Sequence, residues 1–201
     1  VSIATIEPIE YGIKYNSITK KTDEDQVYSG GWYMVGPTVS FLTFPATLVN
    51  IDWTDYSGAQ RAPLTVRDND GQDIRFAFSI QYRLTQSQIG QLYTKYKQNY
   101  ESQFITWADQ EVRNTVGKFN SSAFWSDRAN SGDSMKNAIN DKFTQEGNFA
   151  QCVNFQIINV QLSEKREESL INTQVTIQMG KTKKKEQRAK EIRAGITVVE
   201  S

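Results

Sequence analysis

The chain has 201 residues, of which 38% are hydrophobic and 23% charged, and its net charge is zero. This composition is typical of a globular protein rather than a disordered or membrane-embedded one, and the length allows one domain with a sizeable core. Because the chain has no histidine and a single cysteine, Cys152, the common Ser-His and Cys-His catalytic designs, a disulfide framework and a multi-cysteine metal site are excluded.

Short strands are predicted over the first quarter of the chain. Isoleucines spaced along Val1–Lys14 predict short strands, whereas the charges of Lys20–Gln26 predict a turn. The glycines and proline of Gly30–Pro37 (GGWYMVGP) predict an irregular crossing rather than a regular element. A further strand is predicted over Thr47–Tyr56.

The segment Thr65–Leu84 is predicted to be a β-hairpin. Its turn contains Asp70-Gly71, and glycine supplies the positive φ that tight hairpin turns need. Since successive strand residues point to opposite faces, the second strand has one face for the core and one for water or a partner. The apolar positions are Ile74, Phe76, Phe78, Ile80, Tyr82 and Leu84, and the alternate positions are Arg75, Ala77, Ser79, Gln81 and Arg83.

After the hairpin the apolar spacing changes from the strand period to the helix period. Helices are predicted over Gln86–Asn99 and Tyr100–Phe119. A third helix is predicted to begin at Ser131 or Asp133, which are both good N-cap residues. The β-branched run Val153–Leu162 predicts a last strand.

The C-terminal segment Ser163–Arg193 has few apolar residues. A helix this polar buries little against its own domain, so it either extends into solvent or packs against copies of itself. The predicted fold class is therefore α+β, with a mostly antiparallel curved sheet, packed helices and a projecting C-terminal helix. The expected boundary separates a domain over residues 1–164 from the start of an extended, coiled-coil helix over residues 165–201.

Four stretches carry a resemblance to a known family. They are IEPIEYGI, GGWYMVGP, RDNDGQDIRFAFSIQYRL, and VNFQIINVQL followed by SEKREESLINTQ. In this order, from about Ile3 to Thr173, they resemble the SPFH or band 7 domain shared by stomatins, prohibitins and flotillins. The pair Tyr82-Arg83 after the hairpin is the most specific of these marks. The chain departs from typical members in its richness in Asn, Gln, Ser and Thr.

The resemblance implies a non-enzymatic scaffold without cofactors or catalytic residues. Members of this family are similar in building homo- or hetero-oligomeric rings or cages on one face of a membrane, where they organise a microdomain. The alternative that the resemblance implies, in second place, is a regulatory partner of a membrane protease or ion channel. It implies peripheral attachment, at the cytoplasmic face of the plasma membrane or an endomembrane, or at the mitochondrial inner membrane. We expect the chain to be a segment of a longer protein, which leaves open whether a membrane anchor lies outside the sequence given.

An uncharged stretch supplies candidates for membrane contact, because no charge lies between Asp25 and Asp52. Trp and Tyr favour the boundary between lipid and water. The alternative is that these side chains line the core beside the hairpin. The candidates are Trp32, Tyr33, Met34, Val35, Phe41, Leu42 and Phe44.

The polar face of the hairpin and the long C-terminal helix supply candidates for contact with a neighbouring subunit. The partner is expected to be a second copy of the chain or a closely related subunit. The candidates are Arg75, Ser79, Gln81, Arg83, Leu170 and Ile177.

Three other patterns have two interpretations each. Asp68, Asp70 and Asp73 suggest a calcium site, but the EF-hand spacing and its bidentate glutamate are absent, so a solvated hairpin turn is favoured. Cys152 is either a nucleophile or, as we favour, a small buried hydrophobic residue. The basic residues of 181–193 suit anionic lipid or a solvated, subunit-facing helix, and without stacking aromatics no nucleic-acid partner is expected.

Overall fold

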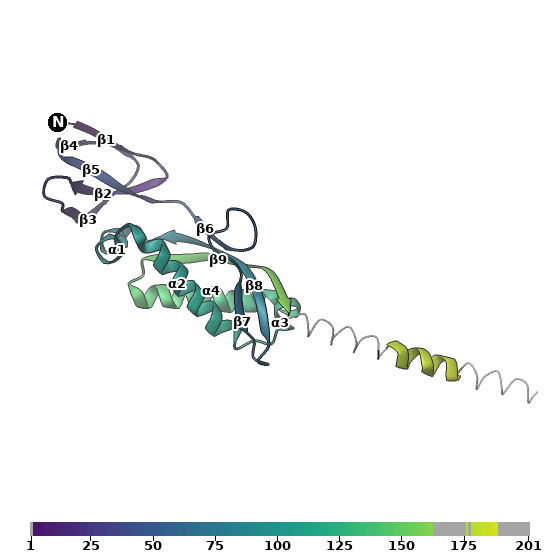
Figure 1. Cartoon of the computed structure of the whole chain (residues 1–201). Coiled ribbons are helices and arrows are strands. Elements are labelled where there is room, and N and C mark those ends of the chain that lie inside the picture. Colours follow the sequence, from purple (N-terminus) through teal and green to yellow (C-terminus); the bar gives the residue numbers. More distant parts are fainter. Residues whose placement is uncertain (1, 163–175, 177, 189–201) are drawn as a thin grey trace, which may run out of the picture. The chain divides into compact units, whose positions relative to one another are not determined.

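The computed structural model describes residues 2–162, 176 and 178–188 (Figure 1). The chain divides into two compact units, Val1–Gln161 and Leu162–Ser201. The first unit combines helices with antiparallel strands, which confirms the predicted α+β class. Its strands form three hydrogen-bonded sheets rather than the single curved sheet that we expected.

Two small sheets form the N-terminal β-region. In one sheet, β1 (Ser2–Ile6) pairs with β4 (Gly31–Val35). In the other, the strand order is β3-β2-β5, with β2 (Glu10–Asn16) between β3 (Thr22–Tyr28) and β5 (Val39–Pro45). All three of these pairings are antiparallel.

Two predicted connections are strands, so both of these predictions were wrong. The expected charged turn at Lys20–Gln26 largely belongs to β3, whose acidic side chains all point into water from a strand at the edge of its sheet. The expected irregular crossing at Gly30–Pro37 contains β4. Of its glycines only Gly31 lies within the strand, at the first position, so the glycines do not interrupt the strand. β4 forms because it pairs with β1, a long-range pairing that the local sequence does not predict.

The third sheet is built around the predicted hairpin, which is confirmed. In this sheet β8 (Asp73–Leu84) pairs with β6 (Val49–Trp53), β7 (Leu64–Arg67) and β9 (Ala150–Leu162). The turn between β7 and β8 has Gly71 at φ 76°, which is the left-handed conformation expected of it. All six apolar positions of β8 are buried.

Helices cover the inner face of this sheet (Figure 1). They are α1 (Ile89–Tyr96), α2 (Tyr100–Val116), the short α3 (Ala123–Ser126) and α4 (Arg128–Glu146). The predicted start of the third helix at Ser131 or Asp133 was wrong by one turn. Ser131 is already inside α4, where its hydroxyl donates to the carbonyl oxygen of Asp127.

Two clusters of aromatic rings, each with a member on β8, fill the space between sheet and helices. On β8, Phe78 stacks on Trp53 with ring centroids 4.4 Å apart and on Phe155 at 5.2 Å. From α2, Phe104 contacts Tyr82 of β8 at 5.3 Å and Phe143 of α4 at 5.0 Å. Through β8 the two clusters join five elements, β6, β8, β9, α2 and α4, so they form the core of the unit.

The N-terminal β-region joins the helices through α1. Gly90 of α1 lies so close to β3 that a Cβ atom at this position would be 2.0 Å from the carbonyl oxygen of Glu24. Nearby, the ring of Phe44 from β5 lies 6.2 Å from Tyr93 and 5.8 Å from Tyr100. The β-region is therefore seated on the helices by close backbone approach and by ring contacts.

In the second unit, residues 178–188 are helical with exposed side chains. Most of the predicted coiled-coil segment, 165–201, lies outside the described residues.

Candidate functional site

The outer face of the β1–β4 pair is apolar and bare. The register places Ile3 opposite Met34 and Thr5 opposite Trp32, so these four side chains share one face. Ile3 is 63% exposed, Trp32 78% and Met34 81%. We call Ile3, Trp32 and Met34 the apolar patch. Among the described residues no other element covers it, and an exposed apolar patch is typical of a site that contacts lipid or protein.

The other membrane-contact candidates lie in different environments. Tyr33 and Phe41 form a triad with Tyr28, with centroids 5.1 to 5.4 Å apart, so their rings are half-buried by one another. Val35 and Phe44 are buried. Leu42 is half-buried.

Of the seven candidates, Trp32 and Met34 are therefore the exposed ones. Ile3 was missed, although alternation along Ser2–Ile6 already separates it from the buried Ile6.

The outer face of β8 holds the four predicted subunit-contact residues that the structure describes. Arg75 and Arg83 are exposed, whereas Ser79 and Gln81 are half-buried. Arg75 pairs with Asp55 at 2.5 Å, and the hydroxyl of Ser79 donates to Asn50 Oδ1 at 3.0 Å.

We call Arg75, Ser79, Gln81 and Arg83 the polar face. The remaining two subunit-contact candidates, Leu170 and Ile177, lie outside the described residues.

The described part of the basic segment is a helix with solvent-exposed cations. Within residues 178–188, the basic side chains form no ion pair with the described residues. Glu186 has the favourable four-residue spacing to Lys190 for a helical ion pair, but Lys190 lies outside the described residues. The exposed cations are Lys181, Lys183, Lys184, Lys185 and Arg188.

The aspartates of the hairpin turn serve the backbone. Asp68 is only 4% exposed, so the turn is less solvated than we expected. One of its carboxylate oxygens accepts from the N–H groups of Asp70, at 3.0 Å, and Gln72, at 2.8 Å. The other accepts from the N–H of Ser121 at 3.2 Å. With Asp73 paired to Arg67 at 3.1 Å, these carboxylates are engaged by protein donors rather than gathered around a cation.

Cys152 has the environment of a structural residue. It is buried in β9, and its thiol donates to the carbonyl oxygen of Asn154 at 3.4 Å. The side-chain amide of Asn140 bonds both the N–H of Cys152, at 2.7 Å, and its carbonyl, at 3.0 Å, as a neighbouring strand would. Burial raises the pKa of the thiol to about 12, so the nucleophilic thiolate is not formed near pH 7.

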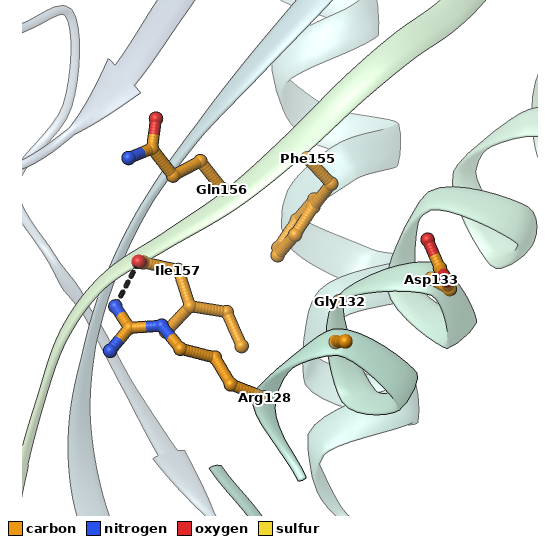
Figure 2. A pocket seen from close by; sticks show the side chains of 7 residues that line it. Arg128, Gly132, Asp133, Phe155, Gln156 and Ile157 are labelled. Carbon is orange, nitrogen blue, oxygen red and sulfur yellow. Dashed lines mark hydrogen bonds between the residues drawn. The ribbon is translucent and has the colours of Figure 1, made fainter. Parts of the chain in front are cut away.

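A cavity of about 520 Å³ lies between the start of α4 and β9 (Figure 2). The guanidinium of Arg128 reaches across it and donates to the carbonyls of Ile157 and, at 3.1 Å, Ile158. Figure 2 shows Asp133 on the far side of the opening, away from this guanidinium. Because Arg128 hydrogen-bonds the carbonyl groups of the edge strand β9, its role is structural.

One half-buried carboxylate, that of Asp109, makes a structural contact. Asp109 of α2 accepts a hydrogen bond from the indole Nε1 of Trp53 at 2.6 Å. Burial raises the pKa of Asp109, against the lowering effects of this bond and of Arg61 and Arg113. It ties α2 to β6, and no second carboxylate is among its partners in the described chain.

Comparison with known proteins agrees with the residue-level resemblance. The family model for the SPFH domain / Band 7 family matches residues 4–194. No curated protein matches the chain. Among the residues that the structure describes, no helix has the length and hydropathy needed to span a bilayer.

Proposed function

Because the chain belongs to the SPFH domain / Band 7 family, we propose that it is a non-enzymatic scaffold whose copies assemble side by side on a membrane. Members of this family are generally membrane-associated scaffolds that self-associate. The proposal for this chain adds which surface meets lipid, which surface meets the next subunit, and how the two depend on each other.

The exposed apolar patch is the observation that supports the proposed membrane contact. Trp32 and Met34 are the most exposed large apolar side chains of β1–β5, and Ile3 lies directly opposite Met34 in the same pair of strands. Tryptophan at a bilayer surface places its ring among the lipid headgroups and its N–H toward water. Ile3 and Met34 beside it contribute apolar area that does not need a hydrogen-bond partner.

The expected strength of this contact explains why assembly matters. Burying three large apolar side chains gains on the order of 5 kcal/mol. Association itself costs several kcal/mol, so one copy binds a membrane weakly and reversibly. When copies are joined, each further patch binds at a high effective concentration, and the assembly is held far more firmly than its members.

The polar face is proposed as the subunit contact. Arg75 and Arg83 are exposed cations at two ends of β8, with half-buried Ser79 and Gln81 between them. A contact of this face with a different surface of the next copy is heterologous, and repetition of a heterologous contact closes a ring when the rotation permits. Leu170 and Ile177 remain predicted contacts for the same assembly.

Liposome flotation tests the membrane contact. The double variant Trp32→Asp, Met34→Asp is expected to lose about 3 kcal/mol of binding free energy, or roughly a hundredfold in affinity. Trp125→Asp is the matched control, because Trp125 is also an exposed tryptophan, 50% exposed, but lies on α3. Unchanged flotation of a folded double variant would refute lipid contact through the apolar patch.

Native mass measurement tests the subunit contact. Arg75→Glu, Arg83→Glu is expected to shift the chain toward monomers without unfolding it, because both side chains are exposed. The same variant should float less well with liposomes, although its apolar patch is intact, because avidity is lost. Assembly that survives both charge reversals would rule out the polar face as the contact.

A further inference from the structure

The connection between β6 and β7 is a closed loop. At its base the N–H of Thr54 donates to the carbonyl of Arg61 at 3.0 Å, and the N–H of Arg61 donates to that of Asp52 at 3.1 Å. The side chain of Gln60 accepts from the N–H of Asp52 at 2.9 Å. With its ends held together, residues 54–60 form a compact loop whose tip is free of the sheet, an arrangement that is frequent at functional sites.

Tyr56 stands at the tip of this loop. Its side chain is 74% exposed, and it makes no hydrogen bond or ring contact with any described residue. Its backbone carbonyl accepts from the N–H of Ala59 at 3.2 Å, across a turn in which Gly58 has φ 98°. Opening the tip at Tyr56 therefore breaks one backbone hydrogen bond and no contact of the Tyr56 side chain, and the nearest side-chain contact is the ion pair of Asp55 with Arg75.

The other tyrosines differ from Tyr56 in both respects. Each lies inside a strand or a helix, and each is buried or half-buried. An enzyme acting on any of them would have to break ladder or helix hydrogen bonds to reach the hydroxyl. They are Tyr11, Tyr15, Tyr28, Tyr33, Tyr82, Tyr93, Tyr96 and Tyr100.

We propose that Tyr56 is a phosphorylation site for a protein tyrosine kinase. The phenol oxygen attacks the γ-phosphorus of ATP, the bond from that phosphorus to the β–γ bridging oxygen breaks, and ADP leaves. The phenol proton passes to the catalytic carboxylate of the kinase. Asp52 and Asp55 stand four residues and one residue before Tyr56, so the segment suits a kinase with a basic substrate groove.

Phosphorylation changes the charge next to the polar face. Around the loop, Asp52 and Asp55 balance Arg61 and Arg75, and Asp55 pairs directly with Arg75. A phosphate on Tyr56 adds a charge of about −1.5 to −2 to this balanced group and competes with Asp55 for the arginine. This part rests on the proposed function: because Arg75 is a proposed subunit contact, the added charge is expected to weaken assembly.

Site mapping on the folded chain tests the modification. The chain of residues 1–201 is incubated with Mg-ATP and a broad-specificity tyrosine kinase, beside a peptide of residues 50–62, and both are mapped by mass spectrometry. The expected result is one phosphoryl group, on Tyr56, which Tyr56→Phe abolishes and the matched control Tyr93→Phe leaves in place. Equal modification of another tyrosine, or a folded chain that stays unmodified whether or not the peptide is phosphorylated, would overturn the proposal.

Native mass measurement of the phosphorylated chain separates the two claims. Smaller assemblies after phosphorylation support control of the polar face. Full assembly with Tyr56 fully phosphorylated overturns that control and leaves the site standing. An unmodified chain that is monomeric at every concentration instead overturns the proposed self-association, again independently of the mapped site.

Discussion

The N-terminal β-region and the helix-covered sheet differ in how completely their apolar side chains are buried. In the sheet of β6 to β9, helices cover one face, so the apolar residues of β8 are buried without exception at alternate positions and the other face is polar. The β1–β4 pair also has two faces, but only the one carrying Ile6 and Val35 is covered. Its second face is apolar as well, and Trp32 and Met34 remain in water.

This difference shows which surface needs a partner. A polar outer face, as on β8, is satisfied by water and gains from a partner mainly through specific charge and hydrogen-bond contacts. An apolar outer face lowers its free energy when lipid or protein removes it from water. This difference supports the proposal that the apolar patch contacts lipid and the polar face contacts protein.

The largest expected effect contrasts two aromatic residues, one from each region. Phe78→Ala removes a fully buried ring that stacks on Trp53 and Phe155, and it is expected to lower the free energy of unfolding by about 3–5 kcal/mol. Trp32→Ala removes a larger but exposed ring and is expected to cost less than about 0.5 kcal/mol. Urea denaturation measures both. A comparable loss from Trp32→Ala would mean that the apolar patch belongs to the core.

The junction between the two regions gives the next largest effect. In Gly90→Ala the new methyl group meets the carbonyl oxygen of Glu24 at 2.0 Å, so α1 must move away from β3, at an expected cost of about 2–4 kcal/mol. Gly117→Ala is the matched control, since its nearest neighbour is 3.7 Å away and its φ is −61°, and it should change stability by less than about 0.5 kcal/mol.

Hydrogen exchange shows where Gly90→Ala acts. Amides of β3 should exchange faster while those of β8 keep their protection, because the helix-covered sheet that contains β8 has its own core. Equal loss of protection in both regions would contradict the view that they are separately packed.

The sequence predicted the structure correctly where a single strand contains the complete apolar alternation. The alternation of β8 specifies its two faces without knowledge of its neighbours, and the Asp70-Gly71 turn fixes the pairing with β7. Prediction failed where long-range pairing decides. The acidic β3 becomes a strand because β2 pairs with it, and Ile3 lies on the bare face because β4 pairs with β1 in this register.

The membrane-contact candidates could likewise be predicted only in part from the sequence. Composition singled out the uncharged stretch that contains Trp32 and Met34, but not which of its side chains are exposed. That depends on the triad of Tyr28, Tyr33 and Phe41, whose members come from three strands. Likewise, the burial of Asp68 requires an N–H from Ser121, which lies after α2, and no local pattern announces such a contact.

The smallest expected effect concerns the half-buried charge of the helix-covered region. Desolvation raises the pKa of Asp109 in the folded state, so the native protein binds more protons than the unfolded chain between about pH 4 and the higher native pKa. Stability therefore falls as pH rises through this window, and the cost is fully present above the native pKa of Asp109. Asp109→Asn removes the charge but keeps an oxygen for Trp53 Nε1, so it is expected to stabilise the protein slightly at pH 7, by less than about 1 kcal/mol.

The pH profile and a second substitution separate charge from hydrogen bonding. Relative to the parent chain, Asp109→Asn should gain stability as pH rises from acid to neutral. Asp109→Ala should instead lose about 1–3 kcal/mol at every pH, because it leaves the indole N–H of buried Trp53 without its acceptor. If Asn and Ala destabilise equally at pH 7, the contact between Asp109 and Trp53 acts through the charge of the carboxylate rather than through the hydrogen bond.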